Sequence, residues 1–349
     1  MIFFLVINLF KTSFGCFFHI VTKTAYNKKY NSNILDLFIF NWRYCMRKFL
    51  LITLLIVVIP YLVVSLFVAE DEIQFYFGDH TMVRVMNEST GVITSVPFEE
   101  YIVGVLAGEM PVSFELEALK AQAVAARSYV MKKIIYNREK EYDVVDTVNN
   151  QVYLSDDYLR TVWKDEYISK INKVKKAVVE TKGEYLDYQG QVVEAFFFST
   201  SVGMTENSED VFVEKVPYLR SVKSEWDRDV SPVFQDQFTF NLSDFYMKLG
   251  LPYEQNIDVE VVEQTSTGRI KQVKINEVLF TGSDVFSKLG LRSTFFTIEQ
   301  NGDDVTVYTK GYGHGVGMSQ YGALGMALEG YTYDEILKYY YQGVTIKKI

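Results

Sequence analysis

Cysteine and histidine are scarce in this chain, and their positions restrict the sites that it can form. Both cysteines, Cys16 and Cys45, come early, so the sequence after residue 45 can form neither a disulfide bond nor a thiolate metal site. The three histidines leave a gap from His80 to His314. Most of the chain therefore lacks both of the side chains that most often hold zinc.

Acidic residues are almost absent from the first 69 positions, which contain Asp36 alone against seven Lys or Arg. The uncharged run 49–69 ends this segment and is long enough to cross a bilayer. Basic residues precede the run and acidic residues follow it, so the positive-inside rule predicts a retained single-pass anchor over 46–69, with residues 70–349 outside the cytoplasm. A cleaved signal peptide is the alternative, although the run is longer than a usual signal sequence.

Residues 1–45 form an N-terminal extension. The sequence Met46-Arg47-Lys48 directly before the apolar run is typical of the start of a signal anchor, so we expect the extension to be an over-extended gene start. The first ten residues are themselves mostly apolar, and a second membrane-associated segment is therefore the alternative.

Basic residues are outnumbered after the apolar run. The whole chain has 35 Lys or Arg and 44 Asp or Glu, of which seven basic and one acidic residue precede position 70. The rest of the chain is left with a formal charge of −15. Such a surface argues against binding to nucleic acid or to anionic lipid, and a neutral or cationic partner fits it better.

Internal repeats and low-complexity linkers are also absent after residue 70, where strand and helix patterns alternate. This alternation indicates an α+β fold, in which a helical part packs against β-rich parts with a cleft between them, and we expect a second lobe over about 184–292. Hairpins are expected at 81–96, 184–199 and 294–308, strands at 259–262 and 270–275, and helices at 97–107, 116–134, 168–181, 319–330 and 332–343.

The short stretch from Gly108 to Pro111 lies between two segments that both have helical patterns. We expect the first helix to stop at Gly108 and the second to begin behind Ser113 as its N-cap. Pro111 favours an extended conformation for Met110, so the chain must turn at Glu109. A turn between two packed helices holds a side chain rigidly, so the Glu109 carboxyl group is a candidate catalytic group. A helix-capping carboxylate is the structural alternative.

A second unusual stretch, 311–323, has glycine at alternate positions from Gly311 to Gly317. Such spacing removes side chains where the backbone must approach another group closely. A phosphate-binding loop is excluded because no Lys-Ser or Lys-Thr pair follows. Its polar residues His314, Ser319 and Gln320 are therefore candidates for binding a ligand.

These stretches resemble one known family. AGEMP at 107–111, EALKAQAVAARSY at 117–129 and GHGVGMSQYGA at 313–323 are similar to motifs of the stage II sporulation protein D family. The resemblance spans about 81–346, and four shorter matches, at 151–153, 181–183, 217–219 and 291–294, occur in the family's order.

The resemblance implies a lytic transglycosylase, anchored in the cell membrane on the mother-cell side of the engulfing septum, that cleaves peptidoglycan glycan strands during sporulation. It implies strands whose stem peptides a partner amidase, stage II sporulation protein P, has removed. It also implies a membrane protein partner, stage II sporulation protein M. The family's catalytic glutamate corresponds to Glu109.

A set of polar residues within the region of resemblance is expected to bind the substrate, and each has a structural role as its alternative. Arg127 could serve only as an ion-pair partner, His314 could orient a loop, and Glu206 is a candidate second carboxylate. The full set is Arg127, Gln151, Tyr153, Ser199, Thr205, Glu206, His314, Ser319 and Gln320.

Glycoside cleavage usually uses an acid and a second carboxylate. A transglycosylase can manage with Glu109 alone, as acid and then as base, if the sugar's own 6-hydroxyl attacks and gives a 1,6-anhydro end. Glu109 must then stay protonated near neutral pH. Burial against Met110 and Phe114 would have to outweigh the dipole of the following helix, and the sequence leaves this balance open.

Some clostridial members of the family hold zinc through His and Cys after the long helix. The matching residues here, 148–151, are Val-Asn-Asn-Gln, so we predict neither a metal nor a cofactor. Two other functions stay open. One is a non-catalytic wall-binding protein that activates an N-acetylmuramoyl-L-alanine amidase, for which Glu109 is irrelevant. The other is a hydrolytic muramidase or glucosaminidase.

Overall fold

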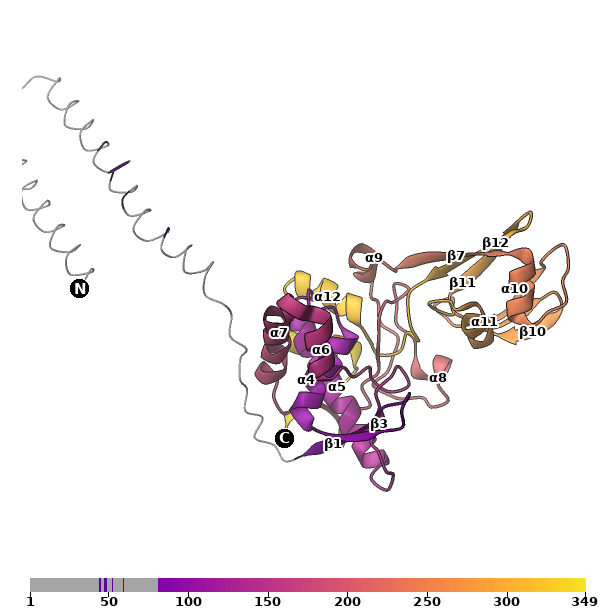
Figure 1. Ribbon diagram of the computed structural model, residues 1–349. Helices are drawn as coiled ribbons and strands as arrows, with labels where there is room; N and C mark the ends of the chain where they lie inside the picture. Colours follow the sequence, from indigo (N-terminus) through magenta and orange to yellow (C-terminus); the bar gives the residue numbers. More distant parts are fainter. Residues whose placement is uncertain (1–43, 45–46, 49–51, 53–58, 60–80) are drawn as a thin grey trace, which may run out of the picture. The chain divides into compact units, whose positions relative to one another are not determined.

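The computed structural model describes residues 81–349 and five isolated positions before them, 44, 47, 48, 52 and 59. The expected extension 1–45 and the expected anchor 46–69 otherwise lie outside the described residues. Among the residues that are described, no helix is both long and apolar enough to cross a membrane. The described residues 81–349 belong to one compact unit (Figure 1).

Helix α5 (Leu116–Tyr136) is the centre of the larger hydrophobic core. Every residue from Ala118 to Val130 except Lys120 is buried, because five alanines in this stretch let neighbouring helices approach closely. Figure 1 shows helices from both ends of the described chain in this region. Four helices contact α5: α4 (Phe98–Glu109), α7 (Tyr167–Glu180), α12 (Gln320–Leu328) and α13 (Tyr333–Tyr340).

Short strands border this core. Strand β1 (Met82–Met86) pairs antiparallel with β2 (Ile93–Pro97) and parallel with β3 (Val144–Val145). Helix α6 (Asp156–Trp163), capped by the Ser155 hydroxyl, follows and leads through one turn of 3₁₀ helix into α7. The hairpin expected at 81–96 and the helix expected at 168–181 are therefore confirmed.

Two further strand groups join distant parts of the chain. Strand β4 (Glu184–Tyr188) pairs with β5 (Gln191–Val192) and with the last strand, β14 (Thr345–Lys348). Strand β6 (Phe197–Phe198) pairs parallel with β13 (Met318–Ser319). This second pairing places the glycine-rich stretch beside the middle of the chain.

A second, smaller hydrophobic core draws its buried side chains from residues 242–307. Two three-stranded sheets and two helices form it, and both helices end at a glycine in the left-handed conformation, Gly250 and Gly290. The second lobe over 184–292 stays a prediction. The elements are β7 (Gln235–Asn241), α10 (Leu242–Leu249), β8 (Val259–Gln264), β9 (Ile270–Ile275), β10 (Val278–Thr281), α11 (Gly282–Leu289), β11 (Phe296–Asn301) and β12 (Asp304–Lys310).

The α+β class is confirmed, and three local expectations are wrong. Helix α4 does not stop at Gly108 but includes Glu109. Ser113 is not the N-cap of α5, since residues 111–114 make a turn in which Phe114 N donates to Pro111 O, and Glu115 precedes the helix instead. The strand expected at 192–199 is broken, with β5 ending at residue 192 and β6 beginning at 197.

Candidate active site

A cleft of about 740 Å³ lies between the end of α4, the loop 148–152, the segment around β6 and the glycine-rich stretch. Two short helices, α8 (Ser208–Val211) and α9 (Asp227–Val230), belong to the segment that links β6 to β7, and Phe212 after α8 completes the cleft wall. Glu109 is the single Asp or Glu among the described residues that line the cleft. Its carboxyl group is therefore the natural centre of the site.

The backbone around Glu109 fixes where its carboxyl group lies. Glu109 is the last residue of α4, and Met110 after it is extended and buried. Gly104 and Gly108, one turn apart on α4, make room for the segment 152–154. A Cβ atom on Gly108 would lie 2.7 Å from the Val152 carbonyl oxygen, and one on Gly104 would lie 2.6 Å from that of Leu154. Both glycines thus bring this segment against the helix.

The environment of Glu109 favours its neutral form. Burial raises the pKa of its carboxyl group, and a hydrogen bond from Val152 N to Oε1, at 2.7 Å, lowers it in part. Within residues 81–349 no Lys or Arg forms an ion pair with it. The helix dipoles around Glu109 act in opposite directions: the negative C-terminal end of α4 disfavours a carboxylate, whereas the positive N-terminal end of α12, at Gln320 in the same cleft, favours one.

Gln320 is the second polar group at the floor of the cleft. It is the first residue of α12 and is 6% exposed. Its side-chain amide lies close enough to Glu109 to lower the pKa of that carboxyl, yet its Nε2 completes no hydrogen bond of normal geometry with the described residues. A buried donor without a partner beside a carboxyl group is suited to a ligand that fills the cleft.

His314 lines the same cleft and is held neutral. Burial, together with the charge of Arg269, lowers the pKa of His314 to about 4. Its Nδ1 accepts a hydrogen bond from Val316 N at 3.1 Å. The ring lies among Phe198 and Phe212, with centroid distances of 5.7 and 5.6 Å. A hydrogen bond with the Phe197 backbone raises that pKa in part, so His314 contributes a neutral, hydrogen-bonded ring to an aromatic wall rather than a charge.

Aromatic side chains make up much of the cleft wall, and none of them was among the residues expected from the sequence. Tyr129 accepts a hydrogen bond from Asn150 Nδ2 at 3.2 Å, and Tyr321 packs edge-on against Phe114. Tyr129, Tyr312 and Tyr321 all lie within or beside the motif stretches, so their positions could have marked them. Aromatic faces with a few polar groups suit a ring-shaped ligand that has apolar and hydroxyl surfaces. The aromatic lining residues are Tyr129, Phe196, Phe197, Phe198, Phe212, Tyr312 and Tyr321.

Three of the expected substrate-binding residues line the cleft: Ser199, His314 and Gln320. Arg127 does not. It is fully buried, its Nη2 lies 2.8 Å from Glu99 Oε2, and its Nη1 donates to the Glu184 carbonyl oxygen at 2.8 Å. The expectation of a sugar contact fails for Arg127 because α5 has no polar face in its middle, and the guanidinium closes a buried ion pair instead.

Gln151, Tyr153 and Thr205 also lie outside the cleft lining. Gln151 is fully buried and accepts a hydrogen bond from the Tyr101 hydroxyl at 3.2 Å, and the Tyr153 ring stacks on Tyr101 at 5.3 Å. The Thr205 hydroxyl accepts a hydrogen bond from Val222 N at 2.9 Å. These three side chains satisfy interior groups and support the segments that border the site.

Glu206 and Ser319 are buried beside the cleft but do not line it. Glu206 pairs with Arg269, whose Nε lies 3.2 Å from its Oε1, and it accepts a hydrogen bond from Thr267. Ser319 caps α12 by accepting from Gly322 N at 3.2 Å, and its hydroxyl donates to Asp227. The Glu206 carboxyl group therefore faces Arg269 rather than the cleft.

In the part of the chain that is described, no group of three or more His, Cys, Asp or Glu side chains lies close enough together to hold a metal ion.

Comparison with known proteins identifies relatives over most of the chain. The profile of the family described as stage II sporulation protein matches residues 86–188. Stage II sporulation protein D of Bacillus subtilis (strain 168) is 44% identical over 270 residues, which cover 76% of this chain and 78% of that protein. The protein of the same name from Bacillus amyloliquefaciens is 42% identical over 271 residues, with coverage of 76% and 78%. An amidase enhancer of Bacillus subtilis (strain 168) is 29% identical over 297 residues, which cover 70% of this chain and 40% of that protein.

Proposed function

This chain belongs to the stage II sporulation protein D family, and from that premise we propose that it is a lytic transglycosylase that cleaves the glycan strands of peptidoglycan during sporulation. One observation carries the proposal. The cleft contains a single, partly buried carboxyl group, Glu109, whose pKa is raised by burial and which lacks an ion-pair partner within residues 81–349.

The proposed reaction uses Glu109 twice. A protonated Glu109 donates its proton to the glycosidic oxygen as the bond from C1 to that oxygen breaks. The sugar's own 6-hydroxyl oxygen then attacks C1, and its proton passes to the Glu109 carboxylate, which restores the acid. The product ends in a 1,6-anhydro sugar, and no water is consumed.

The number of carboxylates favours this route over hydrolysis. Hydrolases of glycosides place two carboxyl groups about 5 to 9.5 Å apart across the scissile bond. The candidate partner Glu206 is committed to a buried ion pair with Arg269. An intramolecular nucleophile removes the need for a second carboxylate, so the one-acid cleft fits a transglycosylase better than a muramidase or glucosaminidase.

The proposed substrate contacts are the polar groups that the cleft exposes. We assign Ser199, His314 and Gln320 to the sugar's hydroxyl and N-acetyl groups, with the aromatic residues against its apolar faces. Arg127, Gln151, Tyr153, Thr205, Glu206 and Ser319 are assigned to the support of these groups. The acidic composition after residue 69 is compatible with a glycan that lacks stem peptides.

Location and partners follow from the same premise. The proposal places residues 70–349 outside the cytoplasm, tethered by an anchor over 46–69, where stage II sporulation proteins P and M would be the amidase and membrane partners. The similarity to an amidase enhancer favours a second candidate function, in which the chain activates an amidase without cleaving glycan itself. This candidate makes no use of a raised Glu109 pKa.

The test is product analysis. Peptide-free glycan strands would be incubated with the full-length chain in detergent, with the Glu109→Gln variant and with Glu115→Gln, a nearby exposed control. Mass spectrometry should find anhydro-ended fragments with wild type and Glu115→Gln but none with Glu109→Gln. Reducing ends would establish hydrolysis instead. A folded wild type that cleaves nothing would refute the enzyme and favour the amidase activator.

A further inference from the structure

A second cavity, of about 450 Å³, adjoins the active-site cleft. Gly313 and His314 line both spaces. Val211 lines the second cavity and the next residue, Phe212, lines the cleft. Because the same two segments border both spaces, the second cavity and the cleft are neighbours that meet at His314.

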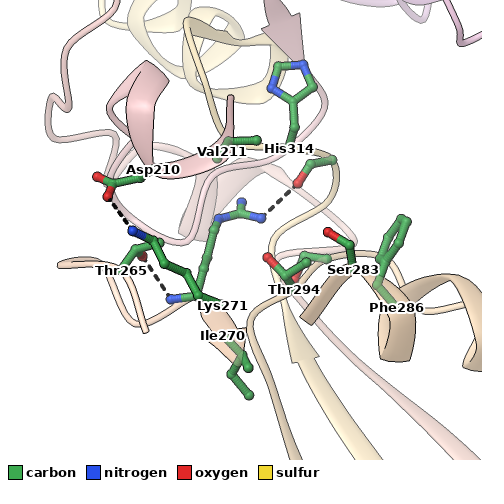
Figure 2. A pocket seen from close by; sticks show the side chains of 12 residues that line it. Asp210, Val211, Thr265, Ile270, Lys271, Ser283, Phe286, Thr294 and His314 are labelled. Atoms are coloured by element: carbon green, nitrogen blue, oxygen red, sulfur yellow. Dashed lines mark hydrogen bonds and ion pairs between the residues drawn. The ribbon is translucent and has the colours of Figure 1, made fainter. Parts of the chain in front are cut away.

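The polar groups of this cavity come from opposite walls. On one side, Lys271 of β9 reaches Asp210 of α8, with Nζ 3.1 Å from Oδ1 (Figure 2). Ser283 and Phe286 of α11 lie on the opposite side. The side chains of Lys271 and Asp210 are 32% and 20% exposed, so both keep surface that a ligand can touch. An ammonium beside a carboxylate offers donors and acceptors together, as a sugar's hydroxyl groups require.

The charges of this cavity are balanced. Lys271 lies near Glu263, at 3.7 Å, as well as near Asp210. Arg269, which also lines the cavity, is paired with Glu206. A strongly anionic ligand such as phosphate would meet these carboxylates, whereas a neutral ligand would not. Phe286 adds a half-buried aromatic ring for an apolar face.

We propose that the second cavity is a distal subsite that binds a further, neutral N-acetylhexosamine ring of the same glycan strand. Lys271 and Asp210 hold the ring's hydroxyl or N-acetyl groups, and Phe286 packs against its face. The inference rests on the proposed function, because it takes the strand in the cleft to be a glycan. It makes affinity depend on strand length, since only a strand that passes His314 reaches Lys271.

The experiment measures binding, so that turnover does not enter. Peptide-free glycan oligomers from disaccharide to octasaccharide would be titrated calorimetrically into the full-length Glu109→Gln chain. The same titrations would use that chain with Lys271→Ala or Phe286→Ala added. Lys274→Ala is the matched control, because Lys274 lies on the same strand, pairs with Glu260 at 3.2 Å and does not line the cavity.

The parent chain should bind long oligomers more tightly than short ones. Lys271→Ala should weaken binding of the longest oligomer about ten-fold, the loss expected for hydrogen bonds from a charged group, and leave the shortest unchanged. Lys274→Ala should change neither. If Phe286→Ala fails to fold, the Lys271→Ala titrations still test the subsite. The Lys271 side chain is partly exposed, so its removal leaves no cavity in the hydrophobic core.

The outcomes separate the subsite from the proposed function. Affinity that does not depend on length, or a Lys271→Ala chain that binds the octasaccharide like its parent, overturns the subsite and leaves glycan cleavage standing. An equal loss for short and long oligomers would also overturn it, because the effect would then lie in the cleft. If no oligomer binds, the result would contradict the proposed glycan cleavage as well as the subsite.

Discussion

Replacing Gly108 by alanine tests how the backbone prepares Glu109 for chemistry. The added Cβ would lie 2.7 Å from the Val152 carbonyl oxygen and 3.0 Å from its Cγ1. Carbon and carbonyl oxygen atoms normally approach to about 3.3 Å, so the segment around Val152 must move by about 0.6 Å. If the shift lies along the hydrogen bond from Val152 N to Glu109, it lengthens that bond from 2.7 Å to the outer limit of normal hydrogen-bond distances.

Stability and activity should respond differently to this change. The forced contact costs about 1–3 kcal/mol, and alanine's higher helix propensity offsets about 0.5–1 kcal/mol of that cost. The chain should therefore stay folded. Misplacing a catalytic group by about 1 Å can lower the rate about 100-fold, so for the smaller shift here we expect kcat to fall about ten-fold or more.

The pH dependence gives the sharper diagnosis. The hydrogen bond from Val152 lowers the Glu109 pKa, so weakening it must raise that pKa further. An acid that must be protonated loses activity as the pH rises through its pKa, so the alkaline limb of kcat/KM should move to higher pH. Val152→Ala is the control, because it keeps the backbone donor and should keep the profile. Wild-type activity and an unmoved limb in Gly108→Ala would refute the reasoning.

Further predictions concern charge. Burial raises the pKa of Glu109 in the folded protein above its value of about 4.3 in the unfolded chain. The wild type therefore loses stability as the pH rises through the folded-state pKa. Glu109→Gln should have a higher Tm than wild type at about pH 8 but not at about pH 4. Arg127→Met leaves the Glu99 carboxylate buried and unpaired, and it should lower the free energy of unfolding in urea by about 3–5 kcal/mol. Adding Glu99→Gln should restore part of that loss. A loss under about 1 kcal/mol would contradict the buried ion pair. His314 should stay neutral to about pH 4 in an NMR titration, and a His314 midpoint near 6.5 would disprove its burial.

Local signals in the sequence were sufficient for much of the fold. The capping box at Thr332 predicted the last helix, because a helix end is decided by a few neighbouring residues, whereas helices α10 and α11 of the second core were not expected. Gly108 was misjudged as a helix stop for the opposite reason. The absence of a side chain at Gly108 leaves room for the carbonyl of Val152, 44 positions later, and no local sequence pattern indicates that contact.

The candidate site divides in the same way. Glu109, His314 and Gln320 stand in motif stretches and line the cleft. Arg127 stands in one as well, yet its partner Glu99 lies on another helix, and sequence periodicity does not show that α5 is buried on all sides. The aromatic wall was missed because Phe212 becomes part of the site only when its loop folds onto His314.

The two-residue pairing of β6 with β13 also bears on how the protein folds. It joins residues 197–198 to 318–319, and the hydrogen bond from Val152 to Glu109 closes a loop of more than forty residues. Contacts of such long sequence separation form late, because their loop-closure entropy must be offset by structure that already exists. During refolding, helical circular dichroism should therefore recover before glycan cleavage does, and the delay between the two signals would time the closing of the cleft.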